Sequence, residues 1–572
     1  MISRRAFLQT AGRVGLLGSR LPWRSSHVGA AATDAPPLFE EIPSSASRIT
    51  WTHENARSPA RFLPESLGPG CAFLDFDNDG WMDIYLVNSG PCDFFQPAQP
   101  LQNALLKNNR DGTFTDVTDK AGVPGGTFGM GVAVGDYNND GWPDIFVTGY
   151  GRSVLYRNNG DGTFTDVTAK AGVAAPGWTT SAVWFDYDND GLLDLFVCSF
   201  VQYGLDKGLV CADRKDGRLY YHYCIPHLFK PTPSLLFHNN GDGTFTPAGR
   251  GTEIERALGK ALGVVATDIN NDGLMDLFVT NDTAQNFLFV NRGRNRWRET
   301  GLTSGVAYGA SGQPRSGMGV DAADLDGDGW QDLLVANIDH EMFSLYKNEK
   351  GSVFTDVARE HGLAEATRLL SGWGLKFFDF DNDGHVDLLL ANGHPDDTIS
   401  LRAPEVKYQE PLLLFRHDGR RLRNISEQAG PVFSKTFAAR GLAVGDFNND
   451  GRVDVLVGCN GEPAVLLRNN AGADNHWAGL KLQGVTCNRD AAGARITWSA
   501  GGMRRSRLKT TGGSYLSSHD PREVLGLGRA TKMDWLEIKW PLPSGKTERF
   551  TGVPIDRYVT IVEGTGKAIS GV

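Results

Sequence analysis

The sequence predicts an all-β protein, a seven-bladed β-propeller followed by a small carboxy-terminal β-domain, and three observations predict it. The 572-residue chain contains 70 Gly and 27 Pro, a content that favours many turns over long helices. One nine-residue pattern, Asp-x-[Asp/Asn]-x-Asp-Gly-x-x-Asp, occurs seven times. The carboxy-terminal part carries no copy and alternates apolar with polar residues, as in residues 536–540.

The seven copies mark one repeating unit with insertions. Their first residues lie 61, 50, 82, 56, 55 and 67 residues apart. At positions 1, 3, 5 and 9 the copies contain Asp75, Asp77, Asp79 and Asp83; Asp136, Asn138, Asp140 and Asp144; Asp186, Asp188, Asp190 and Asp194; Asp268, Asn270, Asp272 and Asp276; Asp324, Asp326, Asp328 and Asp332; Asp379, Asp381, Asp383 and Asp387; and Asp446, Asn448, Asp450 and Asp454.

Each copy is predicted to join two strands of a hairpin. A short apolar strand precedes it, as in residues 131–135, and a β-branched or aromatic strand follows it, as in residues 145–147. A second hairpin turn recurs between the copies, with Asp-Gly at residues 111–112, 161–162 and 242–243. Each unit therefore has four strands. Radial closure buries the faces of each unit against its neighbours, whereas in the rival linear array each small sheet would bury too little surface.

The repeated pattern places oxygen ligands around a tight turn. Positions 1, 3 and 5 put three side chains on one concave side, Gly at position 6 allows the bend, and Asp at position 9 closes the shell. Hard oxygen ligands of this kind suit calcium, with a carbonyl at position 7 and water completing the coordination. We therefore expect about seven Ca²⁺ ions, held by the 28 side chains above.

Other interpretations of the pattern are weaker. Magnesium demands stricter octahedral geometry and sheds water reluctantly. The loops have no bidentate Glu at position 12 and no flanking helical pattern, so they are not EF-hands. Asp and Asn also form simple turns, but seven copies with all four positions filled make that interpretation unsatisfactory.

The charge balance supports calcium as part of the fold. Residues 1–32 contain five Arg and no acidic residue, so the chain without them carries a formal charge of −15 in place of −10, and seven Ca²⁺ ions would bring it to about −1. Packed carboxylates without cations would repel each other. The four loops with Asp at position 3, which begin at Asp75, Asp186, Asp324 and Asp379, are expected to bind calcium more tightly than the three with Asn.

The motifs resemble known families. The acidic loops and the Asn-Asn-x-Asp-Gly-Thr-Phe turns resemble the FG-GAP or VCBS repeats of integrin α-subunit propellers, over residues 45–470. Residues 475–565 resemble the ASPIC/UnbV domain, through the segments 475–477, 488–495, 512–521 and 526–528. The whole chain thus resembles the cartilage acidic protein-like family. The resemblance implies an extracellular calcium-binding protein and provides no settled ligand or reaction.

Residues 1–32 are predicted to be a twin-arginine export signal. Arg4 and Arg5 precede a modestly apolar stretch, and the small residues 29–32 offer a cleavage site; a disordered basic tail is the alternative. We expect a periplasmic or secreted protein. Seven scattered Cys are too few for a disulfide scaffold, and Cys198, Cys211 and Cys224 offer the best local pair.

The predicted function is that of a binding or scaffold module for a glycan or protein ligand, because propeller loops form a broad face and no catalytic motif stands out. The net charge of −10 and the lack of a Lys and Arg cluster argue against a nucleic-acid partner. The sequence contains no stretch of about 18 uninterrupted apolar residues, so it predicts no transmembrane helix.

The alternative is an extracytoplasmic enzyme, a metal-assisted hydrolase or cyclase that uses the propeller channel. Ser514, His519 and Asp520 have the residue types of a nucleophilic triad, but no nucleophile-elbow motif surrounds the Ser. His385 and His394 would need further His ligands for a transition metal, and no paired spacing provides them. The largest insert, residues 199–233 with the tract 223–227, is expected to form a ligand site or a structural lid.

Overall fold

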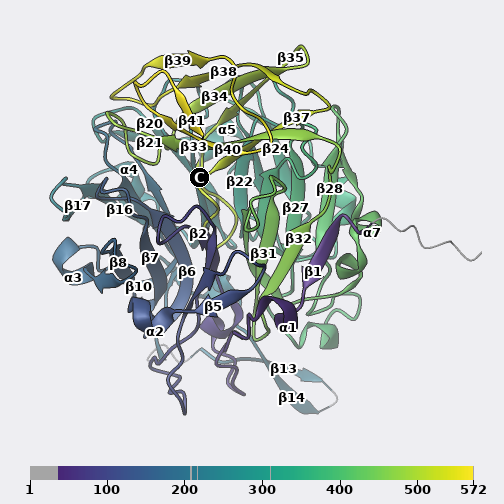
Figure 1. Cartoon of the computed structure of the whole chain (residues 1–572). Coiled ribbons are helices and arrows are strands. Elements are labelled where there is room, and N and C mark those ends of the chain that lie inside the picture. Colours follow the sequence, from purple (N-terminus) through teal and green to yellow (C-terminus); the bar gives the residue numbers. More distant parts are fainter. Residues whose placement is uncertain (1–35, 206–208, 216, 310, 571–572) are drawn as a thin grey trace, which may run out of the picture. The chain divides into compact units, whose positions relative to one another are not determined.

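Strands dominate the computed structural model, in which residues 36–205, 209–215, 217–309 and 311–570 are described (Figure 1). The all-β prediction is confirmed. The predicted export segment lies outside the described residues. Among the described residues every α-helix is a single turn, and no helix has the length and apolar character needed to cross a membrane.

Within the described ranges, the repeat region folds into seven antiparallel units of four strands. The first three units are β2 (Cys71–Leu74), β3 (Asp83–Leu86), β4 (Ala104–Asn108) and β5 (Phe114–Asp116); β6 (Phe128–Gly135), β7 (Asp144–Arg152), β8 (Val154–Asn158) and β9 (Phe164–Asp166); and β10 (Pro176–Phe185), β11 (Asp194–Ser199), β16 (Leu235–Asn239) and β17 (Phe245–Pro247).

The next three units are β18 (Ala261–Thr267), β19 (Asp276–Asn281), β20 (Phe287–Asn291) and β21 (Trp297–Glu299); β22 (Val320–Ala323), β23 (Asp332–Val335), β24 (Ser344–Asn348) and β25 (Phe354–Asp356); and β26 (Gly372–Phe378), β27 (Asp387–Asn392), β28 (Leu413–His417) and β29 (Leu422–Asn424). The seventh combines β30 (Ala439–Gly445), β31 (Asp454–Cys459) and β32 (Val465–Asn469) with β1 (Phe39–Ile42).

The seventh unit joins the two ends of the repeat region. Strand β1 pairs antiparallel with β32, with Phe39 opposite Asn469 and Ile42 opposite Leu466. Phe39 is fully buried and packs against Phe380 and Phe433. The strand precedes residue 45, so the repeat region begins earlier than the expected range of 45–470.

The units pack against each other in a closed cycle. The first strands contact their neighbours in the order β2, β6, β10, β18, β22, β26, β30 and back to β2. Neighbouring units share apolar cores; for example, Ala72 and Tyr85 of the first unit pack with Val132 and Ile145 of the second. Because these strands are covered on both faces, they are nearly continuous apolar runs.

One-turn helices follow the fourth strand of the first six units. They are α2 (Thr118–Ala121), α3 (Thr168–Ala171), α4 (Glu253–Arg256), α5 (Gly301–Ser304), α6 (Leu363–Ala366) and α7 (Ser426–Ala429); α1 (Ser44–Ser47) follows β1. The side chain of Asp116 accepts the amide of Thr118 at 2.9 Å, and Gly122 ends α2 in the left-handed conformation.

The insert of residues 199–233 lies between the second and third strands of the third unit. It contains the pairs β12 (Val201–Gln202) with β15 (Lys230–Pro231) and β13 (Cys211–Lys215) with β14 (Arg218–His222). A 3₁₀ turn follows at Pro226–Leu228; others lie at Leu63–Ser66, Ile399–Leu401 and Pro431–Ser434. The β13–β14 hairpin extends from the lower edge in Figure 1, and the carboxy-terminal strands lie at the upper edge.

The carboxy-terminal part forms two four-stranded sheets with one common core. The sheets are β37 (Glu523–Gly528), β33 (His476–Gln483), β40 (Tyr558–Val562) and β41 (Ala568–Ser570), and β35 (Met503–Leu508), β34 (Arg495–Ala500), β38 (Met533–Lys539) and β39 (Thr547–Phe550). Leu536 and Ile538 are fully buried and Lys539 is exposed, which agrees with the alternation in the sequence. Strand β36 (Thr511–Gly512) leaves these sheets and pairs with β18.

Candidate metal sites

Each acidic loop connects the first and second strands of its unit, and the repeated side chains build its turn. In the third loop, Asp186 at position 1 accepts the amide of Gly191 at 2.9 Å, and Asp190 accepts the amide of Leu192 at 2.9 Å. Asn189 at position 4 has a left-handed φ of 61°. The contact between positions 1 and 6 occurs in all seven loops. The loop therefore curls around its carboxylates.

Asp at position 9 anchors the loop. Asp83 is fully buried; its Oδ2 accepts the amide of Phe76 at 3.2 Å and its Oδ1 accepts the amide of Asn108 at 2.7 Å. Because Asn108 lies on β4, this carboxylate joins the loop to the third strand. Equivalent pairs of contacts occur at Asp194, Asp276, Asp332, Asp387 and Asp454. Position 9 is thus structural, whatever part it takes in binding a metal.

Four loops bring three carboxylates close together, with one oxygen of each within 4.8 Å of the others. The sets are Asp75, Asp77 and Asp83; Asp186, Asp188 and Asp190; Asp324, Asp326 and Asp328; and Asp379, Asp381 and Asp387. They are the four loops with Asp at position 3.

Buried carboxylate oxygens in these four loops lack any hydrogen-bond donor among the described residues. They are Oδ1 of Asp75, Asp77, Asp188, Asp324 and Asp379. Asp75 and Asp379 are only 6% and 4% exposed. An unpartnered buried polar atom is costly, and a divalent cation would satisfy several at once. Oxygen-only ligands with several carboxylates fit calcium.

The three loops with Asn at position 3 are arranged differently. Asn138, Asn270 and Asn448 each donate a side-chain N–H to the Asp at position 5, at 2.8, 3.0 and 3.0 Å. The amide replaces one of the mutually repelling carboxylates and satisfies another. The structure thus separates the loops into the same two groups as the sequence, while the order of affinities stays a prediction.

Basic side chains lie beside the clustered carboxylates. Lys107 of β4 contacts Asp77 and lies 3.4 Å from Oδ2 of Asp79. Arg416 of β28 lies 2.7 Å from Oδ2 of Asp381. A calcium ion in either loop would compete with these side chains for the carboxylates.

Burial raises the pKa of the position-1 carboxyls, and neighbouring acids add to the effect. The pKa of Asp186 rises to about 8 through burial and repulsion from Asp194. The pKa of Asp379 rises to about 8 through burial and repulsion from Asp383 and Asp381. Without cations, these groups therefore retain protons that free Asp would release.

The loops are linked to each other by Asn at position 4. Its side-chain N–H donates to the carbonyl of the position-6 Gly in the next loop, at 2.8 to 3.3 Å. The pairs are Asn78 with Gly141, Asn139 with Gly191, Asn189 with Gly273, Asn271 with Gly329, Asn382 with Gly451 and Asn449 with Gly80. The last pair joins the seventh loop to the first, so the loops form a ring on one face.

The ring is interrupted once, between the fifth and sixth loops. Gly327 stands at position 4 of the fifth loop and has no side chain to donate. A second series of links, from the third-strand Asn of one unit to the position-2 carbonyl of the preceding loop, is also interrupted here. His417 takes the place of that Asn, is 2% exposed, and has two unpartnered ring nitrogens among the described residues.

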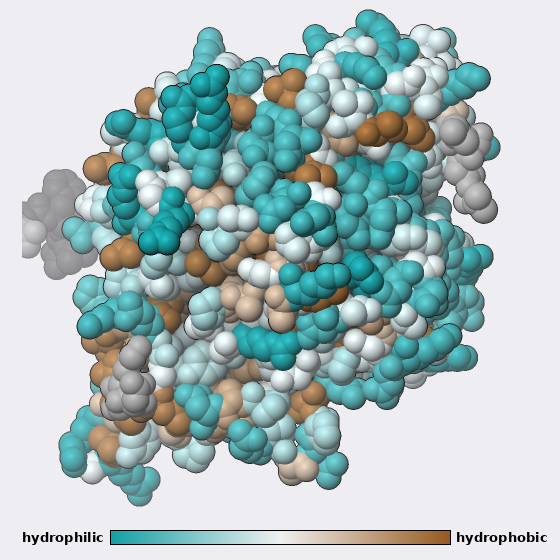
Figure 2. Space-filling view, turned by 90° about the vertical axis from the view of Figure 1, so that its left-hand side faces the viewer, coloured by the Kyte–Doolittle hydropathy of each residue, from teal (hydrophilic) through white to brown (hydrophobic). Residues whose placement is uncertain are grey.

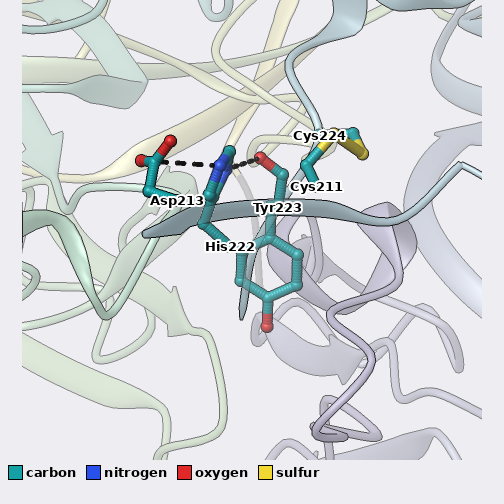
Figure 3. Close-up of a disulfide and its surroundings, with 5 residues drawn as sticks. All are labelled: Cys211, Asp213, His222, Tyr223 and Cys224. Carbon is teal, nitrogen blue, oxygen red and sulfur yellow. Dashed lines mark hydrogen bonds and ion pairs between the residues drawn. A yellow bond between two sulfur atoms is a disulfide. The ribbon is translucent and has the colours of Figure 1, made fainter. Parts of the chain in front are cut away.

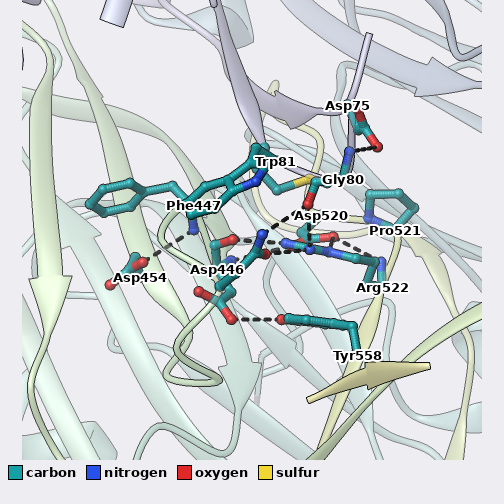
Figure 4. Close-up of polar contacts among 12 residues, drawn as sticks. Asp75, Gly80, Trp81, Asp446, Phe447, Asp454, Asp520, Pro521, Arg522 and Tyr558 are labelled. Carbon is teal, nitrogen blue, oxygen red and sulfur yellow. Dashed lines mark hydrogen bonds and ion pairs between the residues drawn. The ribbon is translucent and has the colours of Figure 1, made fainter. Parts of the chain in front are cut away.

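The carboxy-terminal domain covers much of this ring. Arg522 lies between the first and seventh loops and donates to the carbonyls of Gly80 at 3.3 Å and Asp446 at 2.7 Å (Figure 4). Its guanidinium lies 4.1 Å from the ring centroid of Tyr558, whose hydroxyl donates to Asp446 at 2.7 Å. At the interruption, Arg505 donates to the carbonyl of Gly384 at 2.6 Å.

A segment of this domain, residues 511–522, lies among the first strands of all seven units. Its main-chain and side-chain contacts, 2.8 to 3.3 Å long, reach Cys71, Val132, Ser181, Val264, Val320, Leu375 and Leu442. A Cβ added at Gly70 would overlap the carbonyl oxygen of Leu516, so only glycine permits this approach. A reaction in the propeller channel, the alternative considered above, would require this segment to move out.

The segment before β2 and the insert also pack near Tyr515 of residues 511–522. The hydroxyl of Tyr515 donates to the carbonyl of Leu67 at 3.1 Å. Tyr223 donates to Glu65 at 3.1 Å and is 8% exposed. Cys211 and Cys224 form a disulfide at the base of the β13–β14 hairpin (Figure 3), which selects one of the pairs that the sequence left open. The tract 223–227 therefore includes structural anchors.

The residues of the possible triad have separate partners. Ser514 donates to the carbonyl of Leu442 at 2.8 Å, His519 accepts the amide of Val444, and Asp520 binds Arg522 at 2.7 Å. These contacts are structural. The triad has no support in the described residues.

Neither of the two singled-out histidines belongs to a group of three converging metal ligands in the described chain. His394 lies 3.2 Å from Oδ1 of Asp339 and accepts the amide of Asp396. His385 lies beside His417, with ring centroids 5.8 Å apart.

Sequence reasoning missed the residues that tie the loops together. Asn at position 4 recurs in six of the seven copies and could have been noticed by its periodicity. Arg505 and Arg522 follow no repeat, and the loop carbonyls to which they donate are more than 70 residues away in the sequence, so no local pattern indicates them.

Comparison with known families agrees with the motifs. Residues 484–568 match the ASPIC and UnbV family. Five stretches match the FG-GAP-like repeat family, at residues 75–147, 136–197, 215–279, 268–335 and 324–390. These stretches together cover more than half of the chain.

Similar proteins include cartilage acidic protein 1 of Homo sapiens, 24% identical over 355 residues that cover 59% of this chain and 50% of that protein. The Xenopus tropicalis protein is 27% identical over 293 residues, 49% of this chain and 41% of that protein. Integrin alpha-7 of Mus musculus is 30% identical over 145 residues, 23% and 11% of the two chains. This chain spans about half the length of the cartilage acidic proteins.

Among solved structures, YCF48 bound to D1 peptide is similar, with a TM-score of 0.39 and 11% identity, covering 77% of this chain and 98% of that one. An Agrocybe aegerita lectin has a TM-score of 0.37 and 16% identity, covering 64% and 84%. By its repeats, its carboxy-terminal domain and its relatives, the chain belongs to the FG-GAP-like repeat proteins with an ASPIC and UnbV domain, the family of cartilage acidic protein 1.

Proposed function

We propose that the protein is an exported calcium-binding β-propeller of seven blades that serves as a binding or scaffold module for a glycan or protein ligand. The observation that carries the proposal is the set of buried, unpartnered carboxylate oxygens that converge in four of the loops. Each ion would be held by positions 1, 3, 5 and 9 of its loop. Calcium would neutralise carboxylates that otherwise repel each other and would stiffen the linked ring of loops.

The seven-blade count is supported by the seven four-stranded units and the closed cycle of their first strands. Strand β1 would act as the closing strand of the last blade. Closure removes exposed sheet edges, which a linear array would leave open.

The binding role is supported by an exposed apolar surface on the insert. Seven of the fourteen exposed large apolar side chains in the described residues lie between residues 205 and 228: Leu205, Leu209, Val210, Leu219, Tyr221, Ile225 and Leu228. The face in Figure 2 is mostly hydrophilic with scattered apolar residues, as on most soluble surfaces. A local concentration of exposed apolar groups is typical of a docking surface.

The exported location is supported by two features. Residues 1–32 have the order of a twin-arginine signal. The disulfide between Cys211 and Cys224 suits an oxidising compartment.

The direct test is elemental analysis of the purified protein, with loop variants. The wild type is expected to hold about seven calcium ions per chain. The double change Asp324→Asn and Asp326→Asn is expected to remove one ion, because it removes two of three converging carboxylates. The matched control is Asp161→Asn in an exposed Asp-Gly turn, which should leave the count unchanged.

Two results would overturn the proposal. The first is a wild-type protein, purified in calcium, that contains none. The second is a fifth-loop variant with the same calcium count as the Asp161→Asn control.

A further inference from the structure

A cavity of about 700 Å³ lies where the ring of loops is interrupted. Its walls come from the fifth and sixth loops and Asp446 of the seventh loop, and from β34, β35 and residues 511–524 of the carboxy-terminal domain. Its volume is within the range of small-molecule sites.

The cavity gathers polar atoms that have no partner among the described residues. They are Asp324 Oδ1, Asp379 Oδ1, both ring nitrogens of His417, Arg505 Nη1, Thr511 Oγ1 and His519 Nε2. Asp379 and His417 are 4% and 2% exposed. Native proteins pair most buried polar atoms, so such a concentration in one cavity marks a site for a polar ligand.

The two walls differ in chemistry. On the carboxy-terminal wall, Nδ1 of His519 accepts the amide of Val444, so Nε2 carries the hydrogen and is a donor. Arg505 Nη1 and the Thr511 hydroxyl are donors as well. Arg504, on the same wall, is exposed and has no side-chain partner among the described residues. This wall suits an acceptor-rich, anionic ligand.

The other wall carries carboxylates of the fifth and sixth loops and Asp446 of the seventh loop. Eight acidic and seven basic side chains line the cavity, a formal balance of −1. One calcium ion in each of these three loops would change it to +5. The cavity would then attract an anion, and ligand hydroxyls or a carboxylate could complete the calcium coordination.

We propose that this cavity binds a hydroxyl-rich carboxylic acid of the size of one or two sugar rings, that is, an acidic sugar. With calcium on the two Asp oxygens, the unpartnered groups left are the donors of Arg505, Thr511 and His519 and the ring nitrogens of His417. A neutral His417 ring has one donor and one acceptor nitrogen, and sugar hydroxyls both donate and accept, so they can satisfy this mixture. The carboxylate matches the cationic wall. The proposal rests on calcium binding as proposed above, because without calcium the loops that line the cavity carry no positive charge to attract the anion.

The experiment is isothermal titration calorimetry, in which the calcium-loaded full-length protein is titrated with digalacturonate and, separately, with its neutral counterpart, galactobiose. Digalacturonate is expected to bind at least about tenfold more tightly, since a charge-assisted contact is stronger than a neutral one. The affinity is expected to fall in EDTA. Equal binding of the two sugars, or binding of neither, would overturn the proposal.

Variants separate the cavity from the rest of the molecule. Thr511→Val removes an unpartnered hydroxyl, so it should leave the fold stable but weaken digalacturonate binding by about tenfold. Its control is Thr267→Val, which removes a fully buried, unpartnered hydroxyl outside the cavity. Arg504→Gln removes an exposed positive charge from the cavity and should also weaken digalacturonate binding. Its control is Arg557→Gln, which removes an exposed positive charge outside the cavity. Equal affinities within either pair would overturn the assignment.

Calcium counts distinguish the two proposals. A protein that holds calcium but binds no digalacturonate refutes the acidic-sugar site and leaves calcium binding intact. A protein that holds no calcium refutes the proposed function, and the acidic-sugar site with it.

Discussion

Two kinds of carboxylate occur in each acidic loop. Asp454 at position 9 is fully buried and accepts the amides of Phe447 at 3.2 Å and Asn469 at 2.8 Å. Asp326 at position 3 is exposed; its Oδ1 accepts the amide of Asp328 at 3.2 Å, and Lys347 contacts its Oδ2. The first carboxylate is needed for the fold itself. An Asn at position 326 keeps an oxygen that accepts the amide of Asp328, so the charge of the second carboxylate is expected to matter when a cation is bound.

This difference predicts that calcium affects the stability of two variants differently. Asp454→Asn should lower the free energy of unfolding by about 1 to 3 kcal/mol in EDTA and in calcium, because an amide cannot accept both main-chain N–H groups equally well. Asp326→Asn should lower it only in calcium. Urea unfolding in both buffers checks this, and an Asp326→Asn effect that persists in EDTA would contradict it.

The raised pKa values of the loop carboxyls predict a pH dependence. The pKa of Asp136 is raised to about 7 by burial and repulsion from Asp490, and those of Asp186 and Asp379 to about 8. Between about pH 4 and pH 8 the folded state therefore binds more protons than the unfolded state, so stability is lost as the pH rises. The melting temperature in EDTA should fall between pH 5 and pH 8, and calcium should abolish the fall. A melting temperature in EDTA that rises over this range would contradict the assignment.

At the scale of elements, residues 511–522 join the carboxy-terminal domain to every repeat unit. The segment approaches the first unit closely at Gly70, the residue before β2, where an added Cβ would overlap the carbonyl oxygen of Leu516. Tyr515 and Leu516 are 0% and 1% exposed and share one core with Trp373. The segment thus serves as a central packing element.

Gly70→Ala should therefore destabilise the protein by about 1 to 3 kcal/mol through overpacking. Gly249→Ala is the control, because the nearest atom to an added Cβ there lies 3.6 Å away. Urea unfolding of both variants checks this. A Gly70→Ala variant as stable as Gly249→Ala would contradict this, because it would show that residues 511–522 can shift to accommodate the added Cβ with little loss of stability.

At the scale of the whole molecule, the repeat region and the carboxy-terminal domain depend on each other. Arg522 bridges the first and last loops, and β36 adds a strand to the fourth unit. The centre of the repeat region has an apolar core that includes Met130, Leu262 and Tyr515. Neither part would bury this core alone.

A chain that ends at residue 470 should consequently melt at a lower temperature than the full chain and bind an apolar dye, because the central core loses Tyr515 and Leu516. Calorimetry of the full chain should show one transition for both parts. Two separate transitions, or a truncated chain with an unchanged melting temperature, would contradict this dependence.

The sequence by itself determined the repeating strands, the hairpins and the loop side chains, because these depend on contacts within about ten residues and recur seven times. Asp186 and Gly191, for example, are five positions apart. Only the tertiary structure decided that β1 completes the seventh unit, that residues 511–522 lie among all the first strands, and that a polar cavity opens beside Gly327 and His417. These contacts join residues up to several hundred positions apart and occur once each, so no period or local pattern in a single sequence encodes them.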